Sequence, residues 1–257
     1  MVCAYGENPY VERTIESLER QLVGSNIKLS TSTPSDYLRE ICERHAIEML
    51  VNKDGGGAGA DWNFAYDHAG TALVTLAHQD DYYEPQFTKR VLEAANDRDA
   101  RPFQLIYTDY YELRNDERVD SNALLRIKRI MNAPLKCHAL RGSRFVKRRV
   151  LSLGDPICCP AVTLNREVVD PTVFDTTYIN SCDYKTWVDL ASLPGKFIYV
   201  PEKLMGHRIY AGSSTTKNLQ DDIRRNEDME ILSLLWPRPI AGLINRVYAL
   251  SEKSNEL

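Results

Sequence analysis

Short apolar runs alternate with segments of helical periodicity through the first 77 residues, and this alternation constrains the fold more than any other feature. A regular strand–helix repeat is typical of a mostly parallel sheet with helices on both faces. The sequence therefore predicts an α/β fold of Rossmann-like type. The predicted strands occupy residues Val2–Tyr5, Ile27–Ser30, Ile47–Val51 and Thr71–Ala77.

The segments between these strands contain helix start and stop signals. Asn8 and Pro9 supply a cap and a first turn for a helix that ends before Gly24. Residues Thr33–Asp36 have the form of a capping box with proline at the first helical position. Further elements are predicted as a helix opened by Asp61, a helix over Pro85–Asn96, a strand over Phe103–Asp109, a buried segment at Pro156–Leu164, a helix beginning near Asp183, a strand over Lys196–Val200 and a loop over Met205–Ser214.

The C-terminal part of the chain has a helical pattern of its own. Two helices are expected between residues 219 and 254, with a break at Pro237–Pro239. We therefore predict a large α/β domain over residues 1–215 and a helical appendage over residues 216–257. The sequence leaves three interpretations open for the apolar cluster Ile231–Trp236. The cluster covers the core, forms a dimer contact, or lies on a membrane.

The predicted strand at Thr71–Ala77 leads to two adjacent carboxylates, Asp80 and Asp81. Adjacent carboxylates repel each other unless a cation or hydrogen-bond donors separate them. Open α/β sheets bind ligands at the carboxyl ends of their strands, and Mg²⁺ is commonly held by one or two carboxylates together with substrate phosphates. The pair is therefore a candidate metal site. The alternative is that Asp80 caps the next helix, although Glu84 and Pro85 already supply a helix start.

Composition limits the class of protein. With 257 residues, 43% of them hydrophobic, the chain can bury a substantial core. A net charge of −4 argues against a general nucleic-acid binder. The six cysteines have no CxxC spacing, no signal peptide is apparent, and no apolar run approaches the ~20 residues needed to cross a bilayer. We expect reduced thiols. We also expect a cytoplasmic location, with a peripheral position at the inner face of the membrane left open.

Two further segments have candidate binding roles. The glycine-rich residues 52–59 precede a predicted helix whose free N–H groups suit a phosphate or ribose, but they match neither a G-x-G-x-x-G nor a Walker loop, and a flexible connector is the alternative. Residues 126–149 contain nine Lys and Arg and no acid. This run is a solvated face, or it faces an anionic acceptor such as a lipid-linked pyrophosphate, or an acidic membrane surface.

Four stretches of the chain form a recognisable series. They are the first strand and turn at Val2–Tyr10, the glycine-rich segment Gly55–Asn63, the acidic run Leu76–Pro85 and the late acidic motif Ser181–Trp187. Together they resemble family-two glycosyltransferases of the GT-A fold. They occur in the order of that family, and the likeness extends over about residues 2–215. The family's processive synthases also have membrane spans and a late Gln-x-x-Arg-Trp motif, which this chain lacks.

The resemblance implies a metal-dependent, inverting sugar transfer from a nucleotide-diphosphate donor, with UDP as the expected nucleotide. The acceptor would be a hydroxyl of a glycan or lipid-linked molecule in cell-surface polysaccharide synthesis. Mn²⁺ or Mg²⁺ would be held by Asp80, Asp81 and His207, and Asp183 would accept the proton of the acceptor hydroxyl. Acceptor or phosphate contacts are implied for Arg208 and Trp187, and donor contacts for Ala4, Tyr5, Glu7, Thr31, Asn52, Gly59, Asn63, Gln79 and Asp109.

The chain departs from the family pattern in three places. Cys182 replaces the usual glutamate, Trp62 stands where many relatives have arginine, and the loop Ser30–Pro34 lacks the usual acids. A non-catalytic sugar-nucleotide-binding subunit is therefore one alternative. A nucleotidyltransferase is the other, although Tyr5–Asn8 lacks the glycine-rich signature of that class. Partner nucleic acids are not expected, whereas membrane contact and homo-oligomerisation are left open.

Overall fold

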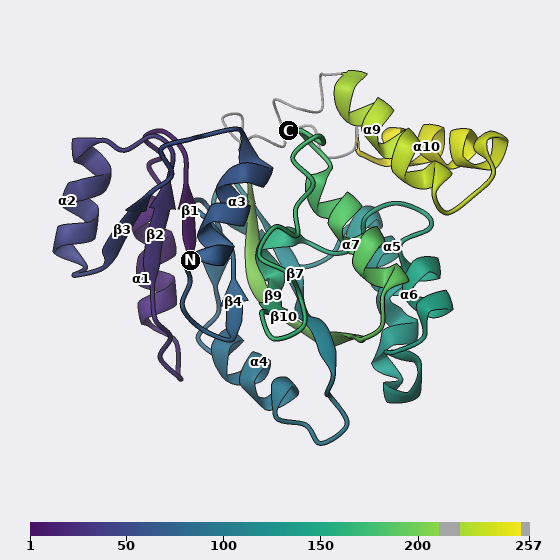
Figure 1. Cartoon of the computed structure of the whole chain (residues 1–257), viewed down its shortest axis with the longest axis horizontal. Helices are drawn as coiled ribbons and strands as arrows, with labels where there is room; N and C mark the ends of the chain where they lie inside the picture. Colours follow the sequence, from purple (N-terminus) through teal and green to yellow (C-terminus); the bar gives the residue numbers. More distant parts are fainter. Residues whose placement is uncertain (211–221, 253–257) are drawn as a thin grey trace.

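The computed structural model describes residues 1–210 and 222–252, which form an α/β fold with two sheets (Figure 1). The first sheet is parallel throughout and uses only strands from the N-terminal part of the chain. The α/β class is thus confirmed. In order across the sheet, the strands are β3 (Glu48–Val51), β2 (Lys28–Thr31), β1 (Val2–Ala4) and β5 (Ala77–His78).

The second sheet is mixed. Only its two longest strands, β7 and β10, run parallel to each other, while its other pairings are antiparallel. In order across the sheet, the strands are β4 (Leu73–Thr75), β9 (Val162–Asn165), β7 (Phe103–Arg114), β10 (Lys196–Ile209) and β6 (Tyr82–Tyr83), with β8 (Glu117–Val119) paired to β7.

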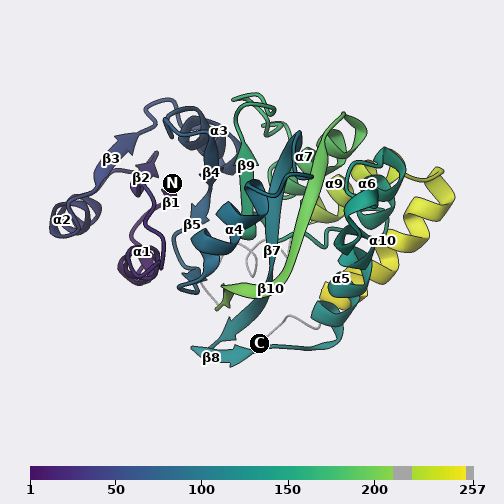
Figure 2. The same cartoon turned by 90° about the horizontal axis from the view of Figure 1, so that it is seen from below.

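Helices cover the sheets. Figure 2 shows α1 and α2 on one side of the first sheet and α3 on the other, as the strand–helix repeat predicts. The helices before the C-terminal pair are α1 (Val11–Glu19), α2 (Asp36–Arg44), α3 (Ala58–Asp67), α4 (Phe87–Ala95), α5 (Ala123–Asn132), α6 (Arg144–Val150) and α7 (Cys182–Ser192). Short 3₁₀ turns occupy Ala133–Lys136, His138–Leu140 and Cys159–Ala161.

The two C-terminal helices are α9 (Asp222–Ser233) and α10 (Arg238–Glu252), so the break expected at Pro237–Pro239 is confirmed. Ile231 and Leu232 of α9 are fully buried in the main hydrophobic core, which favours the core-covering interpretation for that helix. The proposed boundary between residues 215 and 216 lies outside the described residues, and the division into two domains stays a prediction.

The chain changes sheets at Leu76, which is 2% exposed. The single strand predicted over Thr71–Ala77 is wrong, because β4 pairs with β9 in the second sheet while β5 pairs with β1 in the first. The acidic pair follows β5 and precedes β6 of the second sheet. The acidic pair therefore lies at the junction of the two sheets, with a strand of one sheet before it and a strand of the other after it.

Two other local expectations are corrected. The second helix begins at Asp36, because Ser35 is its cap and its hydroxyl accepts the N–H of Leu38 at 3.3 Å. The loop expected from Met205 is strand as far as Ile209, because β10 pairs with β7 along that stretch. Residues 211–214 of the expected loop lie outside the described part of the chain.

Lys147, in the basic run 126–149, is not part of a solvated face. Its side chain is 0% exposed, and Nζ donates to Oε1 of Gln104 at 2.9 Å. It also donates to the carbonyls of Leu190, Leu193 and Gly195, at 3.3, 2.9 and 2.8 Å. The ammonium thus satisfies carbonyls at the end of α7, where cations are favoured.

We expect Lys147→Met to lower the free energy of unfolding by about 2–3 kcal/mol, because it leaves several buried acceptors without a donor. Lys136→Met, at an exposed lysine of the same run, is the control and should change stability by less than about 0.5 kcal/mol. Urea denaturation followed by circular dichroism measures both values. Equal, small effects of the two substitutions would contradict the capping role.

Candidate active site

The backbone of the acidic segment is fixed by hydroxyl groups of α1. Thr14 Oγ1 donates to the carbonyl of Asp81 at 2.8 Å, and Ser17 Oγ accepts the N–H of Tyr83 at 3.1 Å. Both hydroxyl-bearing side chains are buried. The first helix therefore holds the acidic segment in one conformation, a role that no motif in the sequence indicated.

Asp81 is 2% exposed, yet only one of its carboxylate oxygens has partners. Oδ1 lies 3.1 Å from Nδ1 of His207 and accepts the backbone N–H of Arg208 at 2.9 Å. Oδ2 is buried and has no hydrogen-bond partner among residues 1–210 and 222–252. A buried acceptor left unsatisfied costs about 1–3 kcal/mol, and more when charged. Such an atom indicates a ligand that satisfies it.

Asp80, next to Asp81 in the sequence, has different hydrogen-bond partners. Its Oδ2 accepts the hydroxyl of Tyr210 at 3.1 Å, and that hydroxyl in turn accepts Nδ2 of Asn8 at 2.8 Å. Burial and the charge of Asp81 raise the pKa of Asp80 to about 6. Burial also opposes the charged form of Asp81, but His207 and the N–H of Arg208 hold the pKa of Asp81 below its ordinary value. A cation would relieve the repulsion between the two carboxylates.

The pKa values of the two histidines at the site are shifted in opposite directions. Burial lowers the pKa of His207, but the adjacent Asp81 outweighs it, and the pKa of His207 is raised. Burial lowers the pKa of His78 to about 4, so this imidazole is neutral at physiological pH. The ring of His78 stacks on Trp62 with centroids 5.1 Å apart, which gives it a packing role.

These residues fit a hard divalent cation. The described part of the chain has no group of three or more His, Cys, Asp and Glu side chains arranged as a ready-made metal cage. Mg²⁺ sites in nucleotide-dependent enzymes usually use one or two carboxylates and complete the coordination with phosphates and water. Two adjacent carboxylates with one buried, unsatisfied oxygen meet that requirement, so Asp80 and Asp81 would hold Mn²⁺ or Mg²⁺ jointly with a phosphorylated ligand.

Several predicted donor-binding residues meet at the ends of β1 and β5. Tyr5 and Gln79 bond to each other, since the Tyr5 N–H donates to Oε1 of Gln79 at 2.9 Å and Nε2 of Gln79 donates to the Tyr5 carbonyl at 3.2 Å. Ala4 is buried at the end of β1, whereas the side chains of Tyr5 and Glu7 are exposed. The structure thus brings this predicted group together at one sheet edge.

Thr31 and Asn52 follow at the ends of the neighbouring strands. The N–H of Asn52 donates to the Thr31 carbonyl at 2.9 Å, and Nδ2 of Asn52 donates to Oδ1 of Asp61 at 2.7 Å. The hydroxyl of Ser32 donates to Oδ2 of Asp61, also at 2.7 Å. Asp61 therefore organises this edge, although the sequence indicated only that it begins a helix.

Gly59 and Asn63 of α3 lie against the loop that precedes α7. A Cβ added at Gly59 would be 3.7 Å from Cβ of Cys182. Nδ2 of Asn63 donates to the Phe174 carbonyl at 2.8 Å, and Oδ1 accepts the Phe174 N–H at 2.9 Å. Because both ends of its amide bond to the Phe174 backbone, Asn63 holds the loop in place, and its role as a donor contact stays a prediction.

Asp183, the predicted base, lies in the first turn of α7. Its Oδ1 accepts the N–H of Tyr184 at 2.8 Å. Burial raises the pKa of Asp183 above its ordinary value, although the Tyr184 N–H and the positive charges of Arg224 and Lys128 oppose that shift. A raised pKa makes a carboxylate a stronger base, which suits a proton acceptor.

Asp183 has charged and polar neighbours that the sequence did not identify. Asp155 interacts with Asp183 and Lys128, and burial together with Asp183 raises the pKa of Asp155 well above its ordinary value. Lys128 in turn interacts with Tyr110 of β7 and Tyr248 of α10. The cluster therefore combines residues from α5, α7, α10 and the loop before β9, and no local pattern could have joined them.

Trp187 lies in the core, and Asp109 and Arg208 make internal contacts, while their predicted binding roles stay predictions. The side chain of Trp187 is 0% exposed within the main core. Asp109 is satisfied internally, because its Oδ2 accepts Nε of Arg129 at 2.6 Å and its Oδ1 accepts the Tyr110 N–H at 2.9 Å. Arg208 supports the acidic segment, since its Nε donates to the Asp80 carbonyl at 2.8 Å.

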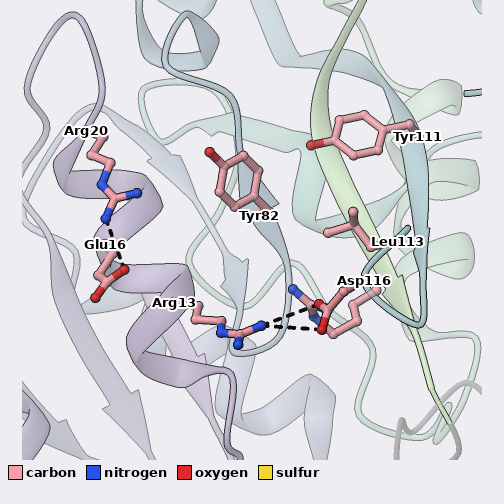
Figure 3. Close-up of a pocket in the computed structure, with 8 residues that line it drawn as sticks. Arg13, Glu16, Arg20, Tyr82, Tyr111, Leu113 and Asp116 are labelled. Carbon is pink, nitrogen blue, oxygen red and sulfur yellow. Dashed lines mark hydrogen bonds and ion pairs between the residues drawn. The ribbon is translucent and has the colours of Figure 1, made fainter. Parts of the chain in front are cut away.

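A pocket of about 330 Å³ borders the acidic segment between α1 and the β7–β8 hairpin (Figure 3). Its basic groups are already paired with acids. Arg13 contacts Asp116 at 3.4 Å, Arg20 contacts Glu16 at 3.2 Å, and Arg208 also pairs with Asp116. The guanidinium of Arg208 therefore faces this pocket and its acid. The pocket is lined by Arg13, Glu16, Arg20, Tyr82, Tyr111, Leu113, Asp116 and Arg208.

Comparison with known families decides the classification. The model of the family described as "Glycosyl transferase family 2" matches residues 1–174, more than half of the 257-residue chain. The chain belongs to glycosyl transferase family 2. The matched region contains the first three of the four motifs, and the fourth, Ser181–Trp187, follows it. No curated protein sequence matches the chain.

Solved structures of similar fold include three glycosyltransferases. The mannosyltransferase PcManGT from Pyrobaculum calidifontis, in complex with GDP-Man and Mn²⁺, has a TM-score of 0.64 at 13% identity over 99% of this chain and 72% of that chain. Glucosyl-3-phosphoglycerate synthase from Mycobacterium tuberculosis, with Mn²⁺, UDP-glucose and phosphoglyceric acid, has a TM-score of 0.60 at 13% identity over 90% and 78%. S. aureus TarS residues 1–349 with UDP has a TM-score of 0.59 at 13% identity over 95% and 68%.

At 13% identity, structural similarity shows the fold alone. The family match supports a nucleotide-sugar glycosyltransferase. The nucleotidyltransferase alternative is therefore set aside. Among the helices described, none has both the length and the hydrophobicity to cross a bilayer.

Proposed function

We propose that this family-two enzyme is a metal-dependent, inverting glycosyltransferase that transfers a sugar from a nucleotide diphosphate to a hydroxyl of a glycan or lipid-linked acceptor, in the synthesis of cell-surface polysaccharide. The observation that supports it most is the buried, unsatisfied Oδ2 of Asp81 next to Asp80. UDP is the proposed nucleotide, because two of the similar structures contain UDP or UDP-glucose. GDP is the competing choice, because a third contains GDP-Man.

The chain's own residues supply binding and proton transfer. Asp80 and Asp81 would hold the cation together with the donor diphosphate, and His207, in contact with Asp81, is the proposed third group at the cation. The bound cation would stabilise the charge that develops on the leaving diphosphate. Thr31, at the end of β2, and Tyr5 and Glu7, which follow β1, are proposed to contact the nucleoside.

Asp183 is proposed to remove the proton of the acceptor hydroxyl as this oxygen attacks the anomeric carbon from the face opposite the leaving group. Its raised pKa suits that task, and the positive charge of Lys128 limits the rise. Inversion at the anomeric carbon follows from a single displacement of this kind. Lys128 and Asp155 are proposed to set the protonation of Asp183.

Transfer and donor hydrolysis should be measured against a panel of UDP-, GDP- and dTDP-sugars with Mn²⁺, with Mg²⁺ and with EDTA. We expect turnover of one nucleotide class, restored by Mn²⁺ or Mg²⁺ and reduced by about 10²-fold or more in EDTA. Undiminished turnover in EDTA would disprove the metal dependence. Nucleotide binding without turnover of any donor would instead identify a non-catalytic binding subunit, the alternative suggested by Cys182.

A further inference from the structure

We propose that the surface formed by α5, α6 and α10 binds the face of an anionic lipid bilayer. We call this surface the basic apolar face, and the proposal does not depend on the transfer reaction. The face has two kinds of exposed side chain, large apolar groups and cations. They are Ile127, Ile130, Phe145, Leu153, Leu243 and Val247, with Arg126, Lys136, Arg144, Arg149 and Arg246.

Contacts between the helices make the face continuous. The guanidinium of Arg149 on α6 lies over the ring of Phe145 at 5.5 Å and over the ring of Trp236, just before α10, at 4.1 Å. The ring of Tyr248 on α10 packs directly on Gly154, where an added Cβ would overlap it. Figures 1 and 2 both show α5 and α6 side by side, and both show α10 at the same end of the molecule.

The apolar side chains of the face are unusually exposed for their size. Their exposed fractions range from 48% at Ile127 to 72% at Ile130, with 70% at Phe145. On α10, Leu243 and Val247 are one helical turn apart, so they form a stripe along the helix. Scattered exposed apolar groups are normal, but a group gathered on adjoining helices marks an interaction surface.

The charge of the face identifies the partner. Neither Ser121–Gly154 nor Arg238–Tyr248 contains an aspartate or glutamate, although the whole chain has a net charge of −4. Cations that surround exposed apolar groups on surface helices are the pattern of helices that lie on anionic membranes. The apolar groups would enter the interface while the arginines contact lipid phosphates.

A second copy of the chain fits this face less well. A symmetric dimer places the same patch of both subunits in contact, which would bring Arg126, Arg144 and Arg246 of each subunit towards those of the other. Like charges brought together in an interface are costly unless acids separate them. Residues Ser121–Gly154 and Arg238–Tyr248 provide none, and the acid of α10, Glu252, is the last residue of that helix.

The face adjoins the Asp183 cluster, because Lys128 of α5 interacts with Tyr248 and Asp155 while Ile127 and Ile130 of the same helix are exposed. A chain bound through this face would hold that cluster close to the lipid headgroups. An acceptor attached to a lipid would then reach Asp183 without leaving the bilayer surface, a consequence that does rest on the proposed function.

Co-sedimentation of the full chain with vesicles tests the proposal. We expect binding to vesicles of phosphatidylglycerol with phosphatidylcholine, and none to phosphatidylcholine alone, at about 0.1 M salt, where the Debye length is about 10 Å. The triple variant Arg126→Gln/Arg144→Gln/Arg246→Gln should weaken binding by about 100-fold. Ile130→Glu/Leu243→Glu should abolish it.

The control is Leu22→Glu/Val168→Glu, which places the same charges on exposed apolar residues outside the face. It should bind vesicles like the unmodified chain, and thermal unfolding should show that all variants are folded. Absence of binding to anionic vesicles, or equal loss in the control and face variants, would overturn the proposal. A dimer that Ile130→Glu/Leu243→Glu converts to monomer, without vesicle binding, would show that a second copy occupies the face.

Discussion

Asp183→Asn is expected to lower sugar transfer by about 10²- to 10⁴-fold, because asparagine cannot accept the proton of the acceptor hydroxyl. The fold should tolerate the change. Asparagine can still accept the Tyr184 N–H that Oδ1 accepts at 2.8 Å. Donor binding, measured by titration of the nucleotide sugar with Mn²⁺, should be unchanged, since Asp183 is proposed to act on the acceptor.

The melting temperature of the Asp183 variants distinguishes a catalytic base from a purely structural cap. The raised pKa of Asp183 means that the folded state disfavours the charged form of this carboxyl group. Asparagine removes that charge and its repulsion with Asp155, so the melting temperature should stay the same or rise. A structural cap predicts the opposite result, a lower melting temperature on replacement by alanine and nearly normal turnover by Asp183→Asn.

Asp189→Asn is the matched control. Asp189 lies on the same helix, is exposed, and pairs with Lys185 one turn away. Its substitution should leave transfer unchanged and stability within about 0.5 kcal/mol. If Asp183→Asn retained near wild-type transfer with metal and donor saturating, the base assignment would have to be abandoned, and the acidic pair would remain as the site of chemistry.

Asp81→Asn is expected to weaken metal-dependent nucleotide binding by at least about 100-fold, because loss of a direct ligand should cost no less than loss of its supporting groups. Transfer should fall with it. Asparagine keeps an oxygen that can accept the N–H of Arg208, bonded at 2.9 Å to Oδ1, so the segment should stay folded. Isothermal titration of UDP with and without Mn²⁺ measures the effect.

The comparison with EDTA makes the result specific. Without metal, the variant and the unmodified chain should bind UDP equally weakly, because the substitution acts through the cation. Asp36→Asn, on the exposed surface of α2, is the control and should bind like the unmodified chain. Equal, metal-stimulated binding by Asp81→Asn would show that the cation is held elsewhere.

The sequence by itself predicted the features that depend on neighbouring residues. Strands β1, β2 and β3 and the helices between them follow from local periodicity and from turn residues, and all appear within a few residues of the expected bounds. The acidic pair could be placed at a strand end because an apolar run leads directly to Asp80 and Asp81. Family resemblance added the family itself, which the match over residues 1–174 confirms, while the role of the late motif Ser181–Trp187 stays a prediction.

Local pattern could not tell a functional side chain from a buried one. Trp187 has the spacing of a helix that begins at a catalytic motif, yet it is fully buried between α7 and the rest of the core. Lys147 belongs to a run of basic residues, yet it lies inside the protein with the carbonyls at the end of α7. Helical periodicity gives the direction of a side chain, but not which neighbouring element covers it.

Only the tertiary structure decided how the site is supported. Thr14 bonds to Asp81, 67 residues away, and His207 contacts the same carboxylate across 126 residues. The partners of Asp183 come from α5, from the loop before β9 and from α10. Such contacts form because the sheets bring distant segments to one edge, and their energies depend on burial and distance in three dimensions, which a linear pattern does not contain.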